Sequence, residues 1–456
     1  MRRAAFRCAD CGWTSPRWVG RCGQCQSWGT VVEQVGSGPS ALREPARPLT
    51  EIPAEGGRAV PSGVAELDRV LGGGLMPGGV VLLAGEPGVG KSTLALEVAA
   101  AAPGRALYLT GEETGAHVRR RAERTGAVHE RLFLAQVRTL DEVLAHIDQV
   151  RPSLVVLDSL QTVTTSAAEG GAGSASQVRA IAAGLVGLAK QERPAVLLVG
   201  HVTKDGAVAG PRVLEHLVDV VVMFEGDRHS RLRLLRGVKN RFGPSDEVGC
   251  LDLVEGGIRS VADPSRLFLS TNPDPVPGRC WTASLEGRRA LPVEVQALVA
   301  PAAGAPALPP RRVSTGVPAA RVALVLAVLE RRCGIAVGGR DVYTATVGGL
   351  SLHEPSGDLA TALALASAAA DVALPAGIAA LGEVGLDGEI RLVGGLRHRI
   401  AEVARVGASR VLLPALTAQE RRDLVAPDGC RLVEVASLGD ALARAAVPPA
   451  LRLVGG

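Results

Sequence analysis

Aromatic residues and long apolar runs are scarce in this sequence of 456 residues. Phe, Trp and Tyr together contribute 2% of the residues, so the hydrophobic cores have to consist mainly of Val, Leu and Ala. No segment reaches about 18 consecutive uncharged apolar residues, and the basic start MRRAAFRCAD lacks the apolar stretch of a signal peptide. We therefore expect a soluble, unexported, cytoplasmic protein that has no membrane partner.

A strong excess of either charge is also absent. The formal net charge is +4, and hydrophobic and charged residues make up 47% and 21% of the chain, which is typical of globular proteins. This balance neither requires nor excludes a nucleic acid as partner, so the local placement of Arg and Lys matters more than their sum. At this length, two or three domains are expected.

The chain divides into three segments and a linker. Residues 1–32 are short and basic and hold four of the eight cysteines. Residues 33–50 include VGSGPSALREPARP, and we interpret them as a linker because Gly, Pro and Ser do not sustain a periodic apolar face. Two longer segments, 51–270 and 275–456, are each long enough to form a domain of their own.

Short apolar runs alternate with helical patterns in residues 51–270. The runs are VVLLAG, ALYLTG, RLFLAQV, SLVVLDS, AVLLVGH and DVVVMFE. This alternation predicts an α/β fold around a largely parallel sheet that is buried on both faces. Residues 275–456 are predicted to form a separate α/β or α+β domain, with helices at 319–332, 358–373 and 397–407, strands in 341–352 and a hairpin around GLDGEI.

The stretch GEPGVGKST lies between an apolar run and a helical pattern, which is the context that a phosphate-binding loop requires. Its glycines let backbone amides approach phosphate oxygens, and the start of the following helix adds partial positive charge. We expect Lys91 to reach the terminal phosphates of ATP and Ser92 to ligate Mg²⁺. The predicted nucleotide-binding residues are Gly85, Glu86, Pro87, Gly88, Val89, Gly90, Lys91, Ser92, Thr93 and Asp158.

Acidic residues near the ends of two later runs complete the predicted ATP site. Asp158 ends the run LVVLD and is expected to hold Mg²⁺ with Ser92, although a carboxylate there would also suit a helix cap. Glu112 and Glu113 follow ALYLT, and we favour Glu112 as the group that positions or deprotonates the attacking water. The alternative for both glutamates is an acidic first turn of the next helix.

A sensor of the γ-phosphate is expected after the run AVLLVGH. His201 ends that run, and Thr203 and Lys204 compete with it for the role. A histidine that merely caps a helix or packs in the core is an equally good interpretation of His201.

Two CxxC pairs in the first segment predict a metal site. Cys8, Cys11, Cys22 and Cys25 supply four thiolates, the usual set for tetrahedral Zn²⁺. A redox pair is the alternative, but two adjacent pairs are better explained by one metal. So short a segment needs metal to fold, and its Trp residues and arginines either cover the ribbon or bind DNA or a protein.

A cationic stretch leads into the sequence KNRFG, residues 239–243. It places five cations close together with no acid between them, which is a pattern that suits a polyanion. A solvated cationic hairpin is the alternative. The candidate DNA-binding residues are Arg231, Arg233, Arg236, Lys239 and Arg241.

The ordered set of a four-Cys ribbon, GEPGVGKST, TGEE, LVVLDS and KNRFG resembles the bacterial RadA/Sms family of recombination and repair ATPases, whose core is RecA-like. The resemblance implies a DNA-dependent ATPase in homologous recombination and DNA repair that drives branch migration as a ring, expected to be a homo-hexamer. It implies single-stranded and branched DNA as partners, with a RecA-type recombinase as a further candidate. ATP, Mg²⁺ and Zn²⁺ are the implied cofactors.

The same resemblance assigns roles to individual residues. Lys91 and Asp158 match the family's Walker positions, and Glu112 matches the water-activating glutamate. Lys239 and Arg241 match the family's characteristic cations, which makes them catalytic candidates alongside Glu112 and Lys91. Whether these two cations neutralise a neighbouring subunit's phosphates or contact DNA stays open at this stage.

The segment 275–456 resembles the proteolytic domain of Lon, which uses a Ser nucleophile and a Lys base. Ser356 falls at the nucleophile position, but Arg397 stands where we match the lysine, and a guanidinium is too basic to serve. No lysine follows Lys239, and Asp358 replaces a glycine of the Lon pattern. We therefore expect a non-proteolytic domain in which Ser356 caps or begins a helix.

Arginines of this last domain are the remaining candidates for an interaction. Arg391, Arg397, Arg399 and Arg405 fall in or beside one predicted helix, where they either assist ring assembly and DNA binding or form a solvated face. Two alternatives to a DNA-dependent ATPase therefore remain: an ATP-dependent Lon-like serine protease and a RecA-like signalling ATPase.

Overall fold

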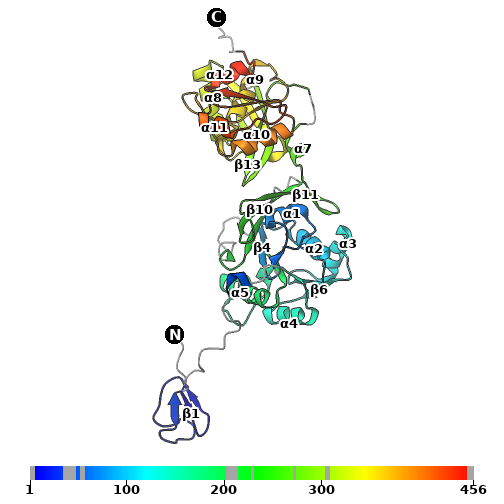
Figure 1. The fold of residues 1–456 in the computed structure, drawn as a ribbon, viewed down its shortest axis with the longest axis vertical. Coiled ribbons are helices and arrows are strands. Elements are labelled where there is room, and N and C mark those ends of the chain that lie inside the picture. The colour runs from blue at the N-terminus through cyan, green and yellow to red at the C-terminus, as the bar shows by residue number, and fades with distance from the viewer. Residues whose placement is uncertain are drawn as a thin grey trace. The chain divides into compact units, whose positions relative to one another are not determined.

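The computed structural model describes residues 6–33, 48–51, 57–201, 214–226, 231–270, 274–302 and 309–448. The chain separates into two compact units, Met1–Gly56 and Gly57–Gly456 (Figure 1). None of the helices in the described ranges combines the length and hydrophobicity that a membrane crossing requires.

The first unit contains a small antiparallel sheet in the order β2-β1-β3. Its core consists of Cys8, Cys22 and Val31, with Phe6, Trp13 and Val19 packed against them. A core of this size buries little apolar surface, so we expect metal binding to contribute to the folding of the ribbon. The elements are β1 (Phe6–Cys8), β2 (Thr14–Ser15), β3 (Val31–Glu33) and a 3₁₀ turn at Leu49–Glu51.

A nine-stranded sheet organises the first part of the second unit, in the order β12-β11-β10-β9-β4-β8-β7-β5-β6. Six neighbouring strands of this sheet run parallel, and they correspond to the six apolar runs of the sequence. The prediction of a largely parallel sheet is therefore confirmed. The parallel strands are β4 (Val80–Gly85), β5 (Ala106–Thr110), β6 (Leu132–Gln136), β7 (Leu154–Asp158), β8 (Ala195–His201) and β9 (Val220–Glu225).

Three antiparallel strands extend this sheet beyond β9. They are β10 (Leu232–Asn240), β11 (Val248–Val254) and β12 (Gly257–Ser260). The alternation of side chains along β4 shows why both faces are buried: Val81 and Leu83 enter one core, whereas Val80 and Leu82 enter the other. The helices are α1 (Ala65–Leu71), α2 (Lys91–Ala101), α3 (Gly115–Thr125), α4 (Leu140–Val150) and α5 (Ala175–Glu192), with a 3₁₀ turn at Leu160–Thr162.

The edge strand β6 departs from the expected burial. Phe133 and Leu134 remain partly exposed because β6 pairs only with β5 and lies at the margin of the sheet. Burial on both faces is therefore a property of the central strands, as the apolar pattern predicts for strands with two neighbours.

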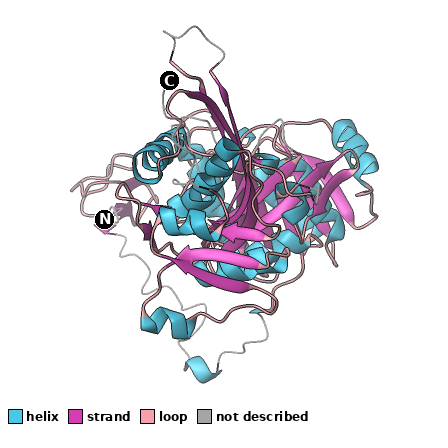
Figure 2. Cartoon of the chain, turned by 90° about the horizontal axis from the view of Figure 1, so that it is seen from above, coloured by secondary structure: helices cyan, strands magenta, loops and turns pink. Residues whose placement is uncertain are grey.

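A seven-stranded mixed sheet forms the remaining part, in the order β15-β16-β14-β13-β17-β20-β21. Figure 2 distinguishes helices from strands by colour and shows that the chain combines many of both. Its strands are β13 (Arg279–Glu286), β14 (Arg289–Pro301), β15 (Arg312–Thr315), β16 (Arg340–Thr346), β17 (Ile378–Ala380), β20 (Arg410–Pro414) and β21 (Arg431–Val435). The long hairpin of β13 and β14 was not predicted from the sequence, whereas the hairpin around GLDGEI is confirmed as β18 (Glu383–Val384) and β19 (Ile390–Arg391).

The predicted helices of this part are also present. The helices are α7 (Ser265–Phe268), α8 (Ala319–Cys333), α9 (Asp358–Ala370), α10 (Leu396–Arg405), α11 (Ala418–Asp423) and α12 (Leu438–Arg444). The expected strand in 341–352 is shorter, because β16 ends at Thr346 and two 3₁₀ turns follow, at Val347–Gly349 and Pro355–Gly357. Gly348 adopts a φ of 74°, which no β-strand accommodates.

Candidate functional site

The phosphate loop joins the end of β4 to the start of α2, as the sequence predicts. Gly88 and Gly90 have φ values of 84° and 111°, which only glycine adopts without strain. A Cβ at Gly85 would lie 2.3 Å from the carbonyl oxygen of Phe224, so this glycine lets the loop rest on β9. The sequence pattern therefore reflects real backbone requirements of the loop.

Lys91 points into this loop from the first turn of α2. Its Nζ donates to the carbonyl oxygens of Gly85 at 2.9 Å and Glu86 at 2.8 Å, and burial lowers its pKa. A phosphate oxygen entering the loop would compete with these carbonyls for the ammonium group. The side chain is thus held at the place where charge neutralisation of a nucleotide is needed.

Asp158 lies at the carboxyl end of β7 with its side chain buried. The hydroxyl of Tyr108 on β5 donates to its Oδ2 at 2.5 Å, whereas Oδ1 is buried without a hydrogen-bond partner among the described residues. Burial raises the pKa of Asp158, and the nearby Ser92 hydroxyl counteracts that rise. An orphaned carboxylate oxygen beside a serine hydroxyl fits Mg²⁺, whose preferred ligands are oxygens.

Glu112 is held by two residues from neighbouring strands. Its Oε1 accepts hydrogen bonds from the Ser159 hydroxyl at 2.5 Å and from Nε2 of His201 at 3.0 Å. The His201 hydrogen bond is the main cause that lowers the pKa of Glu112 to about 2. Glu113 instead forms an ion pair with Arg121 on α3. The two adjacent glutamates therefore have different environments, and only Glu112 is oriented by the strand ends.

His201 ends β8 and orients Glu112. Its other ring nitrogen, Nδ1, is buried without a partner among the described residues, as is Oε1 of Gln161. The two alternatives considered for the sensor position, Thr203 and Lys204, lie outside the described residues. The sequence analysis did not predict the contributions of Tyr108 and Ser159. The available signal was their position in the chain: Tyr108 lies on the strand before Glu112, and Ser159 directly follows Asp158.

The cations of KNRFG are engaged within the chain. Lys239 Nζ donates to the carbonyl oxygens of Glu215 at 2.5 Å and Val218 at 2.8 Å, and Arg241 pairs with Asp219 at 3.3 Å. Asn240 Nδ2 donates to the carbonyl oxygen of Leu71, at the end of α1, at 3.1 Å. The motif thus connects the end of β10 to the segment before β9 and to the last turn of α1.

Strand register places KNRFG away from the phosphate loop of the same chain. Asn240 pairs with Val220, which pairs with Val81 near the start of β4, whereas the loop begins at Gly85 at the other end of that strand. Four residues of extended strand correspond to roughly 13 Å. Lys239 and Arg241 therefore lie at the opposite edge of the sheet from the nucleotide site of their own chain.

The expectation that five adjacent cations face DNA needs correction at two positions. Arg233 is 5% exposed and donates from Nε to the carbonyl oxygen of Val89 at 3.0 Å. Arg236 pairs with Glu286 at 2.6 Å and with Glu225 at 3.5 Å. Alternation along β10 turns Arg233 into the core, so a run of charges in the sequence does not form one charged surface.

The outer cations of this stretch remain accessible. Arg231 pairs with Asp252 at 3.1 Å, but its side chain is largely exposed, as is about half of the Arg241 side chain. Among the sequence-predicted DNA-binding residues, these two have the accessibility that a contact with phosphate requires.

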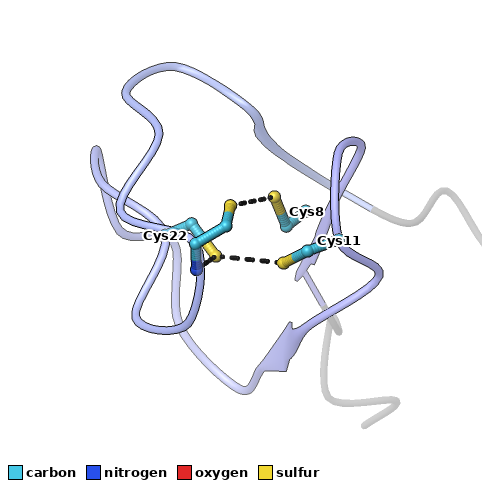
Figure 3. A group of neighbouring side chains, drawn as sticks. Cys8, Cys11 and Cys22 are labelled. Atoms are coloured by element: carbon cyan, nitrogen blue, oxygen red, sulfur yellow. Dashed lines mark hydrogen bonds between the residues drawn. The ribbon is translucent and has the colours of Figure 1, made fainter.

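The four cysteines of the ribbon converge as a metal site requires. The sulfur atoms of Cys8, Cys11, Cys22 and Cys25 all lie within 4.8 Å of one another. Cys8 and Cys25 are 3.6 Å apart and Cys11 and Cys22 3.5 Å, close to the ~3.8 Å between ligands of tetrahedral zinc. Figure 3 shows the labelled Cys8, Cys11 and Cys22 with their sulfur atoms turned toward one centre.

The local structure of the ribbon supports thiolate ligands. The backbone amides of Gln24 and Cys25 both donate to the sulfur of Cys22 at 3.4 Å. The Thr30 hydroxyl is the main cause that lowers the pKa of Cys8 to about 6. Gly12 has a φ of 77°, which suits a tight turn directly after Cys11. These donors stabilise negative charge on sulfur, as metal binding requires.

The ribbon's tryptophans divide into two groups. Trp13 packs against the small core and over Gly23, where a Cβ would lie 2.7 Å from its ring. Trp18 and Trp28 are 63% and 74% exposed, and the Arg21 guanidinium lies 5.7 Å from the Trp28 ring centre. Hydrophobic cover therefore explains Trp13 but not the other two rings.

The serine of the Lon-like domain faces a different arginine from the one expected. Arg399 on α10 is fully buried and donates from Nη1 to the Ser356 hydroxyl at 2.9 Å and from Nη2 to Glu354 at 2.6 Å. Arg397 is exposed, so matching it to the lysine position was wrong. The helical period explains the error, because a shift of two residues along α10 moves a side chain to the other face.

The environment of Ser356 also differs from the expected helix cap. Ser356 lies in the 3₁₀ turn before α9, the helix is capped by Gly357, and the Ser356 side chain forms no capping hydrogen bond. Arg399 further donates to the carbonyl oxygen of Ala283 at 2.5 Å. A fixed, permanently charged guanidinium cannot take a proton from the serine, so this site lacks the base that Lon chemistry needs.

Other arginines of this domain are tied to acids. Arg405 pairs with Glu402 at 2.7 Å and with Asp263 at 2.9 Å. Asp358, which replaces a glycine of the Lon pattern, is buried and pairs with Arg321. Arg391, beside α10, pairs with Glu389 at 3.2 Å.

Family models match three parts of the chain. An AAA domain model matches residues 47–207, a rubredoxin metal binding domain model matches residues 6–33, and a Lon protease (S16) C-terminal proteolytic domain model matches residues 346–445. These matches confirm the predicted fold class: an ATPase core, a four-Cys ribbon and a Lon-like domain. They support ATP as ligand, with Mg²⁺, and a metal such as Zn²⁺ in the ribbon.

Curated relatives match nearly the whole chain. The DNA repair protein RadA of Mycolicibacterium smegmatis is 52% identical over 430 residues, which cover 90% of this chain and 91% of the relative. The DNA repair protein RadA of Mycobacterium tuberculosis is 50% identical, covering 90% and 88%. The DNA repair protein RadA of Brucella abortus is 41% identical, covering 97% and 98%.

The metal centre is tested by substituting one ligand. We expect one equivalent of zinc per purified chain, and loss of that zinc in Cys11→Ser, because three thiolates no longer close the tetrahedral site. Cys333→Ser is the matched control, since Cys333 lies outside the cluster. Metal content by elemental analysis gives the result. Retention of a full equivalent in Cys11→Ser would contradict the assignment, and a visible thiolate-to-iron absorption band would identify iron instead.

The buried arginine of the Lon-like domain is tested by stability. Arg399→Met should lower the free energy of unfolding by roughly 3 kcal/mol or more, because it removes a buried charged donor that bonds to one carboxylate and two carbonyls. Arg397→Met, the exposed control on the same helix, should change it by less than about 0.5 kcal/mol. Urea titration measures both. Equal stability of the two variants would refute the structural role of Arg399.

Proposed function

This chain belongs to the family of RadA DNA repair proteins, and from that premise we propose that it is a DNA-dependent ATPase of homologous recombination and DNA repair. In this proposal ATP hydrolysis drives branch migration of recombination intermediates. The single observation that supports the ATPase best is the convergence of Lys91, Asp158 and Glu112 at one edge of the sheet. Burial lowers the pKa of Lys91, and the negative charges of Asp158 and Glu112 are close enough to counteract that effect. The positive charge of Lys91 in turn helps to lower the pKa of Glu112.

Each group at this edge has a defined task in hydrolysis. The amides of the phosphate loop and Lys91 bind the phosphates, and Ser92 with Asp158 would hold Mg²⁺, which neutralises charge as the terminal phosphate departs. Tyr108 keeps the Asp158 carboxylate oriented. Glu112 stays ionised well below neutral pH, so it accepts a hydrogen bond from the attacking water and orients it toward the phosphate.

KNRFG is proposed to act on the nucleotide of a neighbouring subunit. Within one chain Lys239 and Arg241 lie at the sheet edge opposite to the phosphate loop, which disfavours any role on their own nucleotide. A head-to-tail interface joins different surfaces of two copies and closes into a ring. We propose such a ring, with six subunits, in which Arg241 approaches the neighbour's phosphates. Lys239 holds KNRFG in place for this contact by bonding to the carbonyl oxygens of Glu215 and Val218.

Single-stranded and branched DNA are the proposed partners, with a RecA-type recombinase as a further one in the cytoplasm. Because Arg241 is assigned to the neighbour's nucleotide, Arg231 is the accessible cation of the predicted DNA-binding set that is proposed to contact DNA. The alternative of a Lon-like protease loses its support because Arg399 occupies the place of a base. A signalling ATPase remains the alternative outcome of the experiment on DNA stimulation.

The role of Glu112 is tested by a substitution and a pH profile. Glu112→Gln should lower kcat about 100-fold or more while ATP binding is retained, because an amide still bonds to Ser159 but does not attract the water proton. In the wild type, Glu112 contributes no loss of activity down to about pH 4, since its pKa is about 2. His201→Ala should move the acidic limb upward, because removing the main hydrogen bond raises that pKa.

Glu113→Gln is the matched control for this test, because Glu113 is paired with Arg121. Its kcat should remain within about threefold of the wild type. An equal loss in both glutamine variants, or a normal rate in Glu112→Gln, would reject the assignment of Glu112.

The whole function is tested by ATP hydrolysis with and without single-stranded DNA. We expect DNA to raise the rate of the wild type, Lys91→Ala to abolish turnover and Lys239→Ala to abolish the response to DNA. An assay that follows movement of a synthetic DNA junction then measures branch migration. A wild type that hydrolyses ATP at one rate, whatever DNA is added, would favour a signalling ATPase.

Mixing two inactive variants tests the action between subunits. In an equal mixture of Lys91→Ala and Arg241→Ala, random assembly in a ring places both intact groups at roughly one interface in four. We therefore expect partial recovery of hydrolysis, whereas each variant alone is inactive. No recovery, despite co-assembly measured by size-exclusion chromatography with light scattering, would place Arg241 outside the neighbouring site.

A further inference from the structure

Arg233 is a charge in a core position, which requires a physical reason. It lies on the face of β10 that also carries Leu235, and Leu235 packs in the core together with Val89 of the phosphate loop. Burying a guanidinium is costly unless its donors are satisfied. Among the described residues, Nε donates to the carbonyl oxygen of Val89 at 3.0 Å, and Nη1 donates to that of Leu232 at 2.9 Å.

The bond to Val89 determines the orientation of one peptide group in the loop. The carbonyl of Val89 and the amide N–H of Gly90 belong to the same planar unit, and in a trans peptide they point in opposite directions. A donor that holds the carbonyl from the β10 side therefore directs the Gly90 N–H away from β10. Backbone N–H groups of this loop are what cradle phosphate oxygens, and a positive charge on the carbonyl strengthens the N–H as a donor.

The surroundings leave room for this side chain. A Cβ at Gly226 would lie 2.3 Å from Cδ of Arg233, so a larger residue after β9 would displace the arginine. Gly90 itself has a φ of 111°, and a Cβ there would contact Phe224, Leu253 and Ile258. The loop thus rests on β9, β11 and β12, and Arg233 is a charged hydrogen-bond donor to it from the strand between β9 and β11.

We propose that Arg233 is a positioning residue of the nucleotide site, which holds the Val89 carbonyl so that the phosphate loop presents its amides to ATP. This rests on the ATP site proposed above and adds a residue that the sequence pattern of the loop does not contain. Arg233 also lies on the strand that ends in Lys239 and Asn240, so the phosphate loop and KNRFG are attached to opposite ends of one element.

The test compares Arg233→Met with Arg259→Met in the full-length protein. Methionine retains the apolar stem of the arginine but donates no hydrogen bond, and Arg259 is an exposed arginine of β12 that pairs with Asp252. In Arg233→Met the KM for ATP and the Kd of a fluorescent ATP analogue should rise about tenfold or more, as expected for losing a charged hydrogen bond. Arg259→Met should leave both within about twofold of the wild type.

A merely structural role would give a different kinetic pattern. Partial unfolding reduces the number of active molecules, so it lowers kcat and leaves the KM unchanged, whereas a disordered phosphate loop raises the KM. Arg233→Lys keeps the charge without the planar fork and should show a smaller rise, about threefold. If Arg233→Met does not fold, the Arg233→Lys value decides alone: a KM equal to that of the wild type overturns the proposal.

Two further results would also overturn it. The first is a folded Arg233→Met protein with a normal KM for ATP, which would show that ATP binding does not depend on the hydrogen bond to Val89. A variant with weaker binding of single-stranded DNA and a normal KM would restore the interpretation that Arg233 serves DNA. Failure of the wild type to hydrolyse ATP would instead count against the proposed function, so the two failures are distinguishable.

Discussion

The parallel register of β4, β8, β7 and β5 is the constraint on which the site depends. Gly85 pairs with His201, and Asp158 pairs with Thr110, so the carboxyl ends of four strands meet at one edge of the sheet. Gly85 and His201, which are 116 positions apart in the sequence, become neighbours there. A slip of one residue in any of these strands would turn its side chains to the opposite face and separate the acids from the loop.

Several cations that the sequence analysis singles out are neutralised or buried in the described part of the chain. Arg233 serves the phosphate loop, Arg236 two glutamates, and Arg399 a carboxylate and two carbonyls. The reason is electrostatic, because a guanidinium near a folded core is stable only where acceptors surround it. A local excess of positive charge in a sequence is therefore a weak guide to a surface that binds nucleic acid.

The Lon-like domain illustrates how one side chain alters what a site can do chemically. Ser356 is buried at the turn before α9, and a basic side chain of α10 still reaches its hydroxyl. That side chain is an arginine, which donates and stays charged, so the pair stabilises the packing of α10 against the domain instead of activating a nucleophile. We therefore propose that the likeness of this domain to a protease describes its architecture and not its reaction.

The sequence by itself determined the elements whose signal is local: the phosphate loop, the apolar strands, the CxxC pairs and most helices, because periodicity and glycine placement act within a few residues. It also predicted roles for Asp158 and Glu112, because Asp158 ends one apolar strand and Glu112 follows another. Only the tertiary structure decided which of two adjacent glutamates pairs with Arg121, that Arg399 and not Arg397 faces Ser356, and that Arg233 is inside. Those outcomes depend on strand register and helix phase, which bring together residues distant in the chain and which no local pattern records.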